Sequence, residues 1–220
     1  NKNKINFTFD IFDLRECDLV FISQDVQTNK KNKSDLSKIN YLVKKLRKIL
    51  KSNSTLVILS QVSPGYTEKV KWKKKNLYYQ VETLIFGNAV ERALNPDRII
   101  VGSYRKKPLN KIYNNYIAKF RCPIFIMNYV SAELCKISIN MFLASSVSTT
   151  NALAELCEKI GGSWSNIYPA IQMDKRIGKY SYLLPGLGIS GGNLERDIYN
   201  ITNLANKFYS DKKIFKRWWI

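Results

Sequence analysis

The 220-residue sequence contains no histidine, and this absence removes several kinds of chemistry. Histidine is the usual base of nucleophilic triads and the commonest metal ligand among side chains. Four cysteines are present, but no two of them have the Cys-x-x-Cys spacing of a zinc or redox motif. We therefore expect neither a histidine triad nor a metal site. We interpret the cysteines as reduced core residues of a cytoplasmic protein: Cys17, Cys122, Cys135 and Cys157.

The sequence also lacks a long uninterrupted apolar run. No stretch approaches the roughly 20 residues that a membrane-spanning helix needs, so we expect no membrane segment. Hydrophobic residues make up 45% of the chain and charged residues 24%, which are ordinary values for a globular protein with a core. The chain starts at Asn1 and ends on an apolar pair of tryptophans and Ile220, and we interpret it as an internal fragment of a longer protein.

Acidic residues are scarce beside basic ones, with 17 Asp and Glu against 36 Lys and Arg and a formal net charge of +19. Such an excess is typical of nucleic-acid-binding proteins. Here the basic residues are dispersed, and the one dense run, Lys69–Lys75, also contains Trp72. We favour a solvated loop or helix face for this run. A basic nucleic-acid-binding module remains the alternative from a different class of protein.

The first 128 residues have the pattern of an α/β domain. Residues 17–23 and 55–60 are short continuous apolar runs, typical of strands buried on both faces of a sheet. Between them, Ser34 begins an amphipathic helix with apolar residues at helical period. Further strands are predicted at 98–102 and 122–127. A strand, a helix and a strand form a βαβ unit, so we predict a parallel sheet covered by helices.

A long helix is predicted from Ser131. This residue is a favourable N-cap, Glu133 lies in the first turn, and nothing breaks the helix before Gly161 and Gly162. Such a helix is about 45 Å long, enough to join two domains or to form the core of a dimer. Shorter helices are predicted at 165–173 and from Leu194 to about residue 209.

A glycine-rich segment, residues 185–192, precedes the last of these helices. Glycine lets backbone N–H groups approach a phosphate or a flat ring closely, because no Cβ intervenes. A helix that begins near Asn193 would offer an electropositive N-terminus to an anion. The alternative is a flexible loop or a helix-packing turn, and the motif alone is weak evidence for a site.

Three further places carry candidate chemistry. Lys136 and Asn140 are four residues apart, so they share a helix face on which an amine and an amide can polarise a hydroxyl and hold a water. Their apolar flanks argue against a merely solvent-exposed polar pair. Glu82 stands among apolar residues, either as a structural hydrogen-bond partner or as an acid–base group. Arg176 either binds a phosphate through two guanidinium N–H groups or is an ordinary surface arginine.

Taken together, these segments resemble the UDP-glucose/GDP-mannose dehydrogenase family. DLVFISQDVQT, TLVILSQVSPGYT and VETLIFGNAVERALNPDRIIVG are similar to parts of its NAD-binding domain. AELCKISINMFLA, LCEKIGGSW, DKRIG and PGLGISGGNLERD are similar to its central helix and catalytic glycine loop. The blocks occur in family order over nearly the whole chain.

The resemblance implies an α/β fold of the 6-phosphogluconate-dehydrogenase-like type. Residues 1–128 would be the C-terminal part of a Rossmann-type NAD-binding domain with a parallel sheet. Residues 129–210 would be a long central helix and an all-α dimerisation and catalytic domain. Residues 211–220 would start a C-terminal sugar-nucleotide domain.

The resemblance also implies a reaction, in which the C6 alcohol of a nucleotide sugar is oxidised to a carboxylate with two NAD in succession. By position, Glu82 would be the acid–base glutamate, and Lys136 and Asn140 the pair that steadies the oxyanion and a water. Asp197 would support that water. The other implied contacts are with the cofactor at Thr28, Gln61 and Arg196, and with the substrate at Leu84, Arg176, Gly188 and Gly191. A UDP- or GDP-hexose substrate and a homodimer through the central helix are implied as partners.

One departure from the family bears on the chemistry. The catalytic cysteine of the family falls at Asn193, whose amide cannot form the thiohemiacetal and thioester of the second oxidation. In addition, Gln61 replaces a threonine, and Gln-Val precedes Glu82 where Asn-Pro is usual. We therefore expect NAD-dependent oxidation of a nucleotide sugar with the second step altered or lost. The alternative is a nucleotide-sugar-binding relative without net oxidation, such as an epimerase that recycles its NAD.

Overall fold

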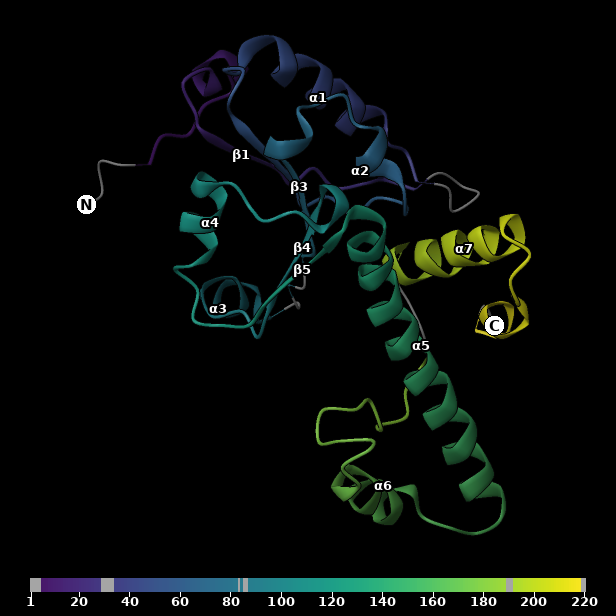
Figure 1. The fold of residues 1–220 in the computed structure, drawn as a ribbon. Coiled ribbons are helices and arrows are strands. Elements are labelled where there is room, and N and C mark those ends of the chain that lie inside the picture. Colours follow the sequence, from purple (N-terminus) through teal and green to yellow (C-terminus); the bar gives the residue numbers. More distant parts are fainter. Residues whose placement is uncertain (1–4, 29–33, 83, 85–86, 189–191, 219–220) are drawn as a thin grey trace. The chain divides into compact units, whose positions relative to one another are not determined.

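The computed structural model describes residues 5–28, 34–82, 84, 87–188 and 192–218, without the side chains of residues 192 and 193. The chain divides into two compact units, residues 1–27 with 34–136 and residues 28–33 with 137–220. The division falls inside one long helix, α5 (Tyr129–Lys159), and Figure 1 shows the order of the elements along the chain. Each unit is described by itself.

A five-stranded sheet in the order β1-β2-β3-β4-β5 forms the centre of the first unit. Its strands are β1 (Leu19–Ile22), β2 (Thr55–Ile58), β3 (Leu77–Gln80), β4 (Ile99–Ser103) and β5 (Ile124–Asn128). The four strands predicted from apolar runs are therefore confirmed, and with them the Rossmann-like α/β class. The strand β3 was not predicted, because Leu-Tyr-Tyr-Gln directly follows a lysine-rich stretch and is not a continuous apolar run.

The prediction of a uniformly parallel sheet is wrong at one pairing. The pairs β1–β2, β2–β3 and β4–β5 are parallel, but β3 and β4 are antiparallel, with Tyr79 opposite Gly102. An antiparallel pair needs no crossover over a face of the sheet. The connection from β3 to β4, which carries the short helix α3 (Ala89–Leu94), therefore reverses the chain direction without adding a βαβ unit.

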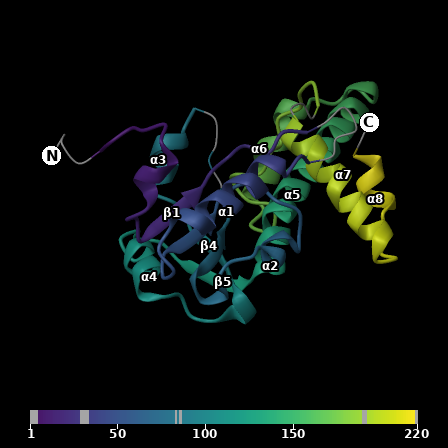
Figure 2. The same cartoon turned by 90° about the horizontal axis from the view of Figure 1, so that it is seen from above.

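Helices cover both faces of the sheet, and alternate strand residues supply the two cores. On one face, α1 (Ser37–Ile49) packs against residues such as Leu56 and Ile58, and Figure 2 shows this helix lying across the strands. On the other face, α4 (Lys111–Ile117) packs against Val57. The remaining short elements of the unit are α2 (Tyr66–Lys69) and 3-10 turns at Ile11–Leu14, Lys74–Asn76 and Tyr104–Lys106.

Two predicted helix starts are wrong, and a side chain explains each shift. The helix α1 begins at Ser37 rather than Ser34, and the Asp35 carboxylate accepts the Ser37 N–H at 2.9 Å. The helix α5 begins at Tyr129 rather than Ser131, because Asn128 at the end of β5 caps it. The Asn128 Oδ1 accepts the N–H of Ser131 at 2.8 Å, the geometry of an N-cap.

The first turns of α5 lie against β4 at Gly102. A Cβ atom at this position would lie 3.0 Å from the Cβ of Ala132 and 3.1 Å from the Cα of Tyr129. Helix and strand backbones therefore approach so closely that a side chain at Gly102 has no room. The buried Tyr129 adds a polar anchor, because its hydroxyl donates to the carbonyl oxygen of Leu77 at 2.7 Å.

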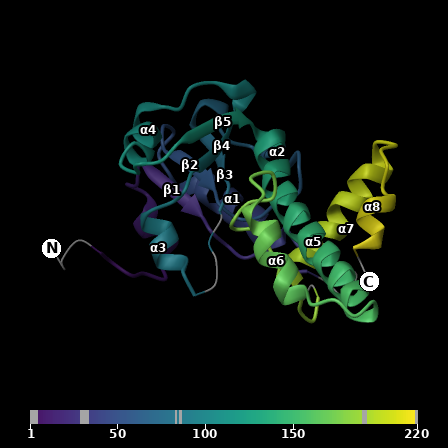
Figure 3. The same cartoon turned by 90° about the horizontal axis from the view of Figure 1, so that it is seen from below.

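In the second unit, all regular structure in the described residues from 137 onwards is helical. The helix α6 (Trp164–Met173) packs through Trp164 against Ala154 and Cys157 of α5, and Figure 3 shows the two helices side by side. A second apolar cluster joins α5 to α7 (Gly192–Lys207) and α8 (Lys213–Arg217). Its members are Ile137, Met141, Ile198, Ile201, Phe215 and Trp218.

The predicted end of α5 is confirmed. The helix stops at Lys159, and Gly161 follows with a φ of +82° in the left-handed region. The N–H of Gly162 returns to the carbonyl oxygen of Cys157 at 2.8 Å, which satisfies one of the last free carbonyls of the helix.

The expectation that no segment has membrane-spanning length and composition is wrong for α5. The most apolar 18 residues of this 31-residue helix have a mean hydropathy of 1.2, and 28% of them are buried within the structure. By length and composition alone, the helix could cross a membrane. The long core helix of a soluble protein has the same composition, so this property does not by itself define a membrane protein.

Gly102→Ala is expected to lower the free energy of unfolding by about 1–3 kcal/mol, the usual cost of overpacking a core. The added methyl group would meet the backbone of α5, which cannot move aside as a side chain can. Urea unfolding followed by circular dichroism measures the change. Gly186→Ala is the matched control, because a Cβ there would meet nothing within 4 Å, and no loss of stability is expected. Equal losses in both variants would contradict the close approach at Gly102.

Candidate functional site

The carboxyl ends of the parallel strands β1, β2 and β3 lie at one edge of the sheet, where Ile22 is paired with Ile58. The loops that follow β1 and β2 are tied together. The Ser60 hydroxyl donates to the carbonyl oxygen of Gln24 at 2.6 Å, and the Ser60 N–H donates to that of Ile22 at 3.2 Å. Open α/β sheets bind their ligands at this edge. The predicted cofactor contact Gln61 is half-buried and directly follows Ser60.

Glu82 lies at the same edge, two residues beyond the end of β3. The pairing continues to Val81, whose N–H donates to the carbonyl oxygen of Ile100 at 3.0 Å. The Glu82 carboxylate accepts the N–H of Leu84 and is half-buried, and both residues line a cavity of about 180 Å³. Leu84 is 47% exposed. The sheet thus brings the predicted acid–base residue and the loop of Gln61 to neighbouring strand ends.

Lys136 and Asn140 lie one turn apart on α5, as their spacing predicts. Within the part of the chain that the structure describes, the half-buried Lys136 makes no hydrogen bond or ion pair. Its ammonium group has three hydrogen-bond donors, and its contact with a ligand stays a prediction. A primary amine beside an apolar helix flank can stabilise negative charge that develops on a bound oxygen.

In the second unit, Asn140 meets Asp197. The Nδ2 of Asn140 donates to the Oδ2 of Asp197 at 2.6 Å, and the Asp197 side chain is fully buried. The Nε of Arg196, itself 3% exposed, lies 3.7 Å from the other carboxylate oxygen. Because the amide nitrogen of Asn140 points at the carboxylate, its carbonyl oxygen is turned away and can accept a hydrogen bond from a water or a hydroxyl.

The substrate contacts predicted in the second unit lie in less regular segments. Arg176 is exposed and binds the Asp174 carboxylate through Nε at 3.0 Å and through a second nitrogen at 2.5 Å. These bonds hold the pKa of Asp174 below its usual range. Arg176 also lines a cavity of about 720 Å³ bounded by α5 and the segment 176–183.

The glycine-rich segment is described only in part. Gly188 has a φ of +99°, which favours glycine, and open space around its Cα. Gly191 lies outside the described residues. The helix α7 begins at Gly192, so Asn193 lies in its first turn rather than before it, and the Asn193 side chain lies outside the description. Thr28, which follows the loop after β1, is half-buried. The roles of these residues, and those of Glu82, Asn140 and Asp197, stay predictions.

Sequence reasoning missed the function of one buried acid, Glu133. The sequence predicts Glu133 in the first turn of the helix, where an acid favours the dipole, but its side chain is fully buried against another segment. One carboxylate oxygen accepts the N–H of Thr67 at 2.8 Å and the other accepts that of Gly65 at 2.5 Å. Burial raises the pKa of Glu133, and the bonds from Thr67 and Gly65 oppose this rise. One feature of the sequence could have indicated this burial: Glu133 lies one turn before Lys136 on the same apolar helix.

Burial also perturbs Tyr66, which lies between the two residues that donate to Glu133. Loss of water around the phenol raises its pKa to about 12, and the nearby charge of Glu133 acts in the same direction. The hydroxyl donates to the Oδ1 of Asn40 on α1 at 2.9 Å. The segment after β2 is therefore fixed to α1 as well as to α5.

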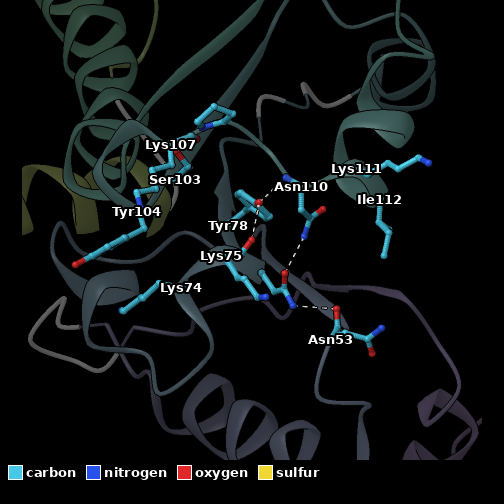
Figure 4. Close-up of a pocket in the computed structure, with 12 residues that line it drawn as sticks. Asn53, Lys74, Lys75, Tyr78, Ser103, Tyr104, Lys107, Asn110, Lys111 and Ile112 are labelled. Atoms are coloured by element: carbon cyan, nitrogen blue, oxygen red, sulfur yellow. Dashed lines mark hydrogen bonds between the residues drawn. The ribbon is translucent and has the colours of Figure 1, made fainter.

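A further cavity, of about 620 Å³, lies at the opposite edge of the sheet (Figure 4). Its described lining includes four lysines and no acid, but Figure 4 shows Tyr104 and Lys111 pointing in opposite directions, away from the floor at Tyr78 and Asn110. That floor is internally hydrogen-bonded: Asn110 donates from its side chain to Thr55 at 2.8 Å and from its backbone to Tyr78 at 2.8 Å. None of the predicted site residues lines this cavity, and we assign it a structural role.

The fold and the polar edge of the sheet define an α/β protein of the dinucleotide-binding kind, and comparisons with known proteins identify its family. Residues 1–117 match the NAD binding domain of the UDP-glucose/GDP-mannose dehydrogenase family, and residues 130–218 match the central domain of that family. The chain belongs to this family.

Individual relatives agree with this assignment. A UDP-glucose 6-dehydrogenase of Rickettsia typhi is 33% identical over 213 residues, which cover 93% of this chain and 49% of that protein. One of Drosophila melanogaster is 29% identical over 209 residues, covering 86% of this chain and 43% of that protein. The chain thus spans about half the length of these relatives.

Solved structures show the same fold. A UDP-glucose dehydrogenase from Pyrobaculum islandicum superposes with a TM-score of 0.79 at 24% identity, covering 91% of this chain and 49% of that one. A UDP-D-ManNAc dehydrogenase from Pyrococcus horikoshii gives a TM-score of 0.78 at 21% identity, covering 96% of this chain and 51% of that one.

NAD is the cofactor of the matched domain, and the described residues fit it. Three parallel strands end at one edge, the Ser60 hydroxyl ties the loops after β1 and β2 together there, and Gln61 adds an amide side chain next to this bond. A dinucleotide binds across such an edge in Rossmann-type sheets.

The Asn140–Asp197 bond is expected to show a coupling free energy of about 1.5–3 kcal/mol in a double-mutant cycle, because the acceptor is a buried carboxylate. The cycle uses Asn140→Ala, Asp197→Ala and the double variant, each measured by urea unfolding. The exposed pair Glu155 and Lys159 on the same helix is the control, and its coupling is expected to be much smaller, because solvent screens both charges. Equal coupling in the two pairs would show that Asn140 and Asp197 do not meet in solution.

Proposed function

We propose that the protein containing this chain oxidises the C6 alcohol of a nucleotide sugar with NAD, and that its second oxidation is altered or lost. The observation that carries the proposal is the buried bond between Asn140 and Asp197, with Lys136 one turn earlier on the same helix. These residues form the oxyanion and water-holding part of the site that the family resemblance implies. Their spacing and the bond between them support this role.

Each residue has a defined task in the first oxidation. Glu82 takes the proton of the C6 hydroxyl, since its carboxylate is half-buried and lies at the ligand-binding edge of the sheet. Lys136 donates to the C6 oxygen as negative charge develops there. NAD, when bound, supplies the acceptor for the hydride that leaves C6. The alcohol thereby loses one proton and one hydride and becomes an aldehyde.

The second oxidation lacks its usual nucleophile. Asn193 stands where the family has cysteine, and an amide cannot form a thiohemiacetal with the aldehyde. The carbonyl oxygen of Asn140, oriented by Asp197, can accept a hydrogen bond from a water in this step. We propose that the enzyme either stops at the aldehyde or oxidises its hydrate, formed from that water, at a reduced rate.

Counting NADH per sugar consumed tests this chemistry. With UDP-glucose as the sugar, about one NADH per sugar and an aldehyde trapped by hydroxylamine are expected, because Asn193 cannot carry an acyl group. Absorbance at 340 nm and analysis of the product give the two numbers. Two NADH with free acid at full rate would show that no nucleophile is needed. Tightly held NAD with no net NADH would favour the epimerase-like alternative.

Asn193→Cys is the companion variant. It restores the thiol that the family uses, so acid product and a trapped thioester are expected to increase by about tenfold or more. Lys136→Met is the control, since it removes the oxyanion donor and is expected to lower turnover by about 10² or more in either background. If Asn193→Cys forms no thioester while wild-type oxidation is normal, Asn193 does not occupy the position of the nucleophile.

We further propose a cytoplasmic homodimer held together by α5. The support is the apolar surface of α5 that the chain itself leaves uncovered: Phe142 is 77% exposed, Leu153 46% and Leu156 53%. Burial of such residues is the main driving force of association. The four cysteines are all free, as expected in a reducing compartment. The cavity that four lysines line has Tyr104 and Lys111 pointing in opposite directions, away from its floor, and gives no support to a nucleic-acid partner.

Leu156→Lys is expected to weaken the dimer by about tenfold or more, because it places a charge in an apolar interface. Sedimentation equilibrium over a range of protein concentrations measures the dissociation constant. Lys159→Gln is the control, because Lys159 lies three residues further along the same helix and is exposed. This variant should leave the dissociation constant unchanged. A monomeric wild-type protein would contradict the proposal, as would co-sedimentation of the protein with phosphatidylcholine vesicles through α5.

A further inference from the structure

The carboxylate of Glu133 joins two segments that are distant in sequence. It belongs to the second turn of α5, and its two backbone donors, Gly65 and Thr67, lie 68 and 66 residues earlier. Both oxygens are used and the side chain is fully buried. The contact lies within the first unit, so it is part of one compact body.

The segment that Glu133 binds cannot satisfy its own backbone groups. The helix α2 has four residues, and its first N–H groups have no partner within the helix. A side chain just before a helix normally accepts them, but this position is Gly65, at a φ of +89° and without a side-chain oxygen. Glu133 supplies the missing acceptor from another element.

A buried carboxylate is a costly way to fill space. Removing a carboxylate from water costs several kcal/mol, and an apolar residue of similar volume would pack against the sheet without that cost. The two charge-assisted bonds offset the cost only when Gly65 and Thr67 are held in place. The arrangement is therefore directional: it specifies where the segment after β2 must lie relative to α5.

The two segments joined in this way carry two predicted site residues. Gln61 lies four residues before Gly65, and Lys136 lies three residues after Glu133, about one helical turn away. On its other side the same stretch of α5 is held by the close approach of Ala132 to Gly102. Helix, strand and loop are thus fixed to one another within a few residues of each predicted contact.

We propose that Glu133 is a positioning residue, which holds the cofactor-side loop 61–65 in register with the turn of α5 that carries Lys136. The catalytic consequence of this inference rests on the proposed function. The hydrogen bonds from Gly65 and Thr67 to Glu133 do not depend on it. Glu133 touches neither substrate nor cofactor in this proposal; it acts through Gly65, Thr67 and the loop that they end.

Hydrogen exchange on the purified protein without ligand tests the hydrogen bonds from Gly65 and Thr67 to Glu133. In the wild type, the amide hydrogens of Gly65 and Thr67 are expected to exchange at least about tenfold more slowly than unstructured amides, because each is bonded to a buried carboxylate. Exchange at unprotected rates would overturn the proposal, and this measurement does not depend on any variant folding.

Glu133→Gln tests the positioning. Its amide offers one acceptor and places a donor against the other N–H, so exchange at Gly65 and Thr67 should become about tenfold faster, and exchange at Gln61 should rise with it. Glu68→Gln is the matched control, an exposed glutamate on α2 itself, and should change none of these rates. Unchanged exchange in Glu133→Gln would also overturn the proposal.

Steady-state kinetics with UDP-glucose and NAD separate positioning from simple loss of folded protein. A smaller folded fraction lowers kcat alone, whereas a displaced loop should raise the KM for NAD about fivefold or more and leave the KM for the sugar within about twofold. An unchanged KM for NAD in an active Glu133→Gln enzyme would refute the positioning role. An inactive wild type would refute the proposed function instead, and the exchange rates would still decide whether Glu133 holds the loop.

Discussion

The close packing of α5 against β4 is the constraint on which the first unit depends. Gly102 allows the helix backbone to approach the strand, and Ala132 completes the contact with the smallest side chain available. A helix held at this distance places Glu133 where its carboxylate reaches the segment after β2, and Lys136 one turn further along. The apolar core and the polar site are therefore set by the same helix-to-strand distance.

Polar groups buried beside α5 serve orientation rather than stability. Glu133 and Asp197 are both fully buried, and each is paired with hydrogen-bond donors from elements far away in sequence. A buried carboxylate stabilises a fold little, because its desolvation offsets most of its attraction to its partners. It does select one geometry, since any displacement leaves the charge without its donors. Two buried carboxylates act in this way beside α5. Glu133 fixes the position of the loop of Gln61, and Asp197 fixes the orientation of the Asn140 amide.

Asn193 is the departure from the family that the proposed function depends on, because the resemblance places it where the catalytic cysteine falls. Lys136, Asn140 and Asp197 retain the residue types that the family resemblance implies, and two of them are hydrogen-bonded to each other. The cost of keeping an aspartate buried is consistent with continued use of the site. Under the proposed function, the departure at Asn193 therefore changes the fate of the aldehyde rather than the binding of the nucleotide sugar.

Local pattern was a good guide wherever local physics decides the structure. The continuous apolar runs at 17–23 and 55–60 are strands, and the two glycines after α5 end the helix. The start of α5 could not be read in this way, because Ser131 and Asn128 are both good caps and only the end of β5 selects Asn128. The strand β3 escaped notice because its pairing on both sides, rather than its own composition, makes it a strand.

The sequence by itself determined the class of fold, the family, and the helical spacing that puts Lys136 and Asn140 on one face. Tertiary structure alone decided the direction of β4 against β3, the partner of Asn140 57 residues away, and the task of Glu133. The reason is physical: periodicity and capping follow from neighbouring residues, whereas these contacts join segments that are distant in sequence, up to the 68 residues between Gly65 and Glu133. Which donors meet a buried carboxylate is then a property of the packing, and no local pattern contains it.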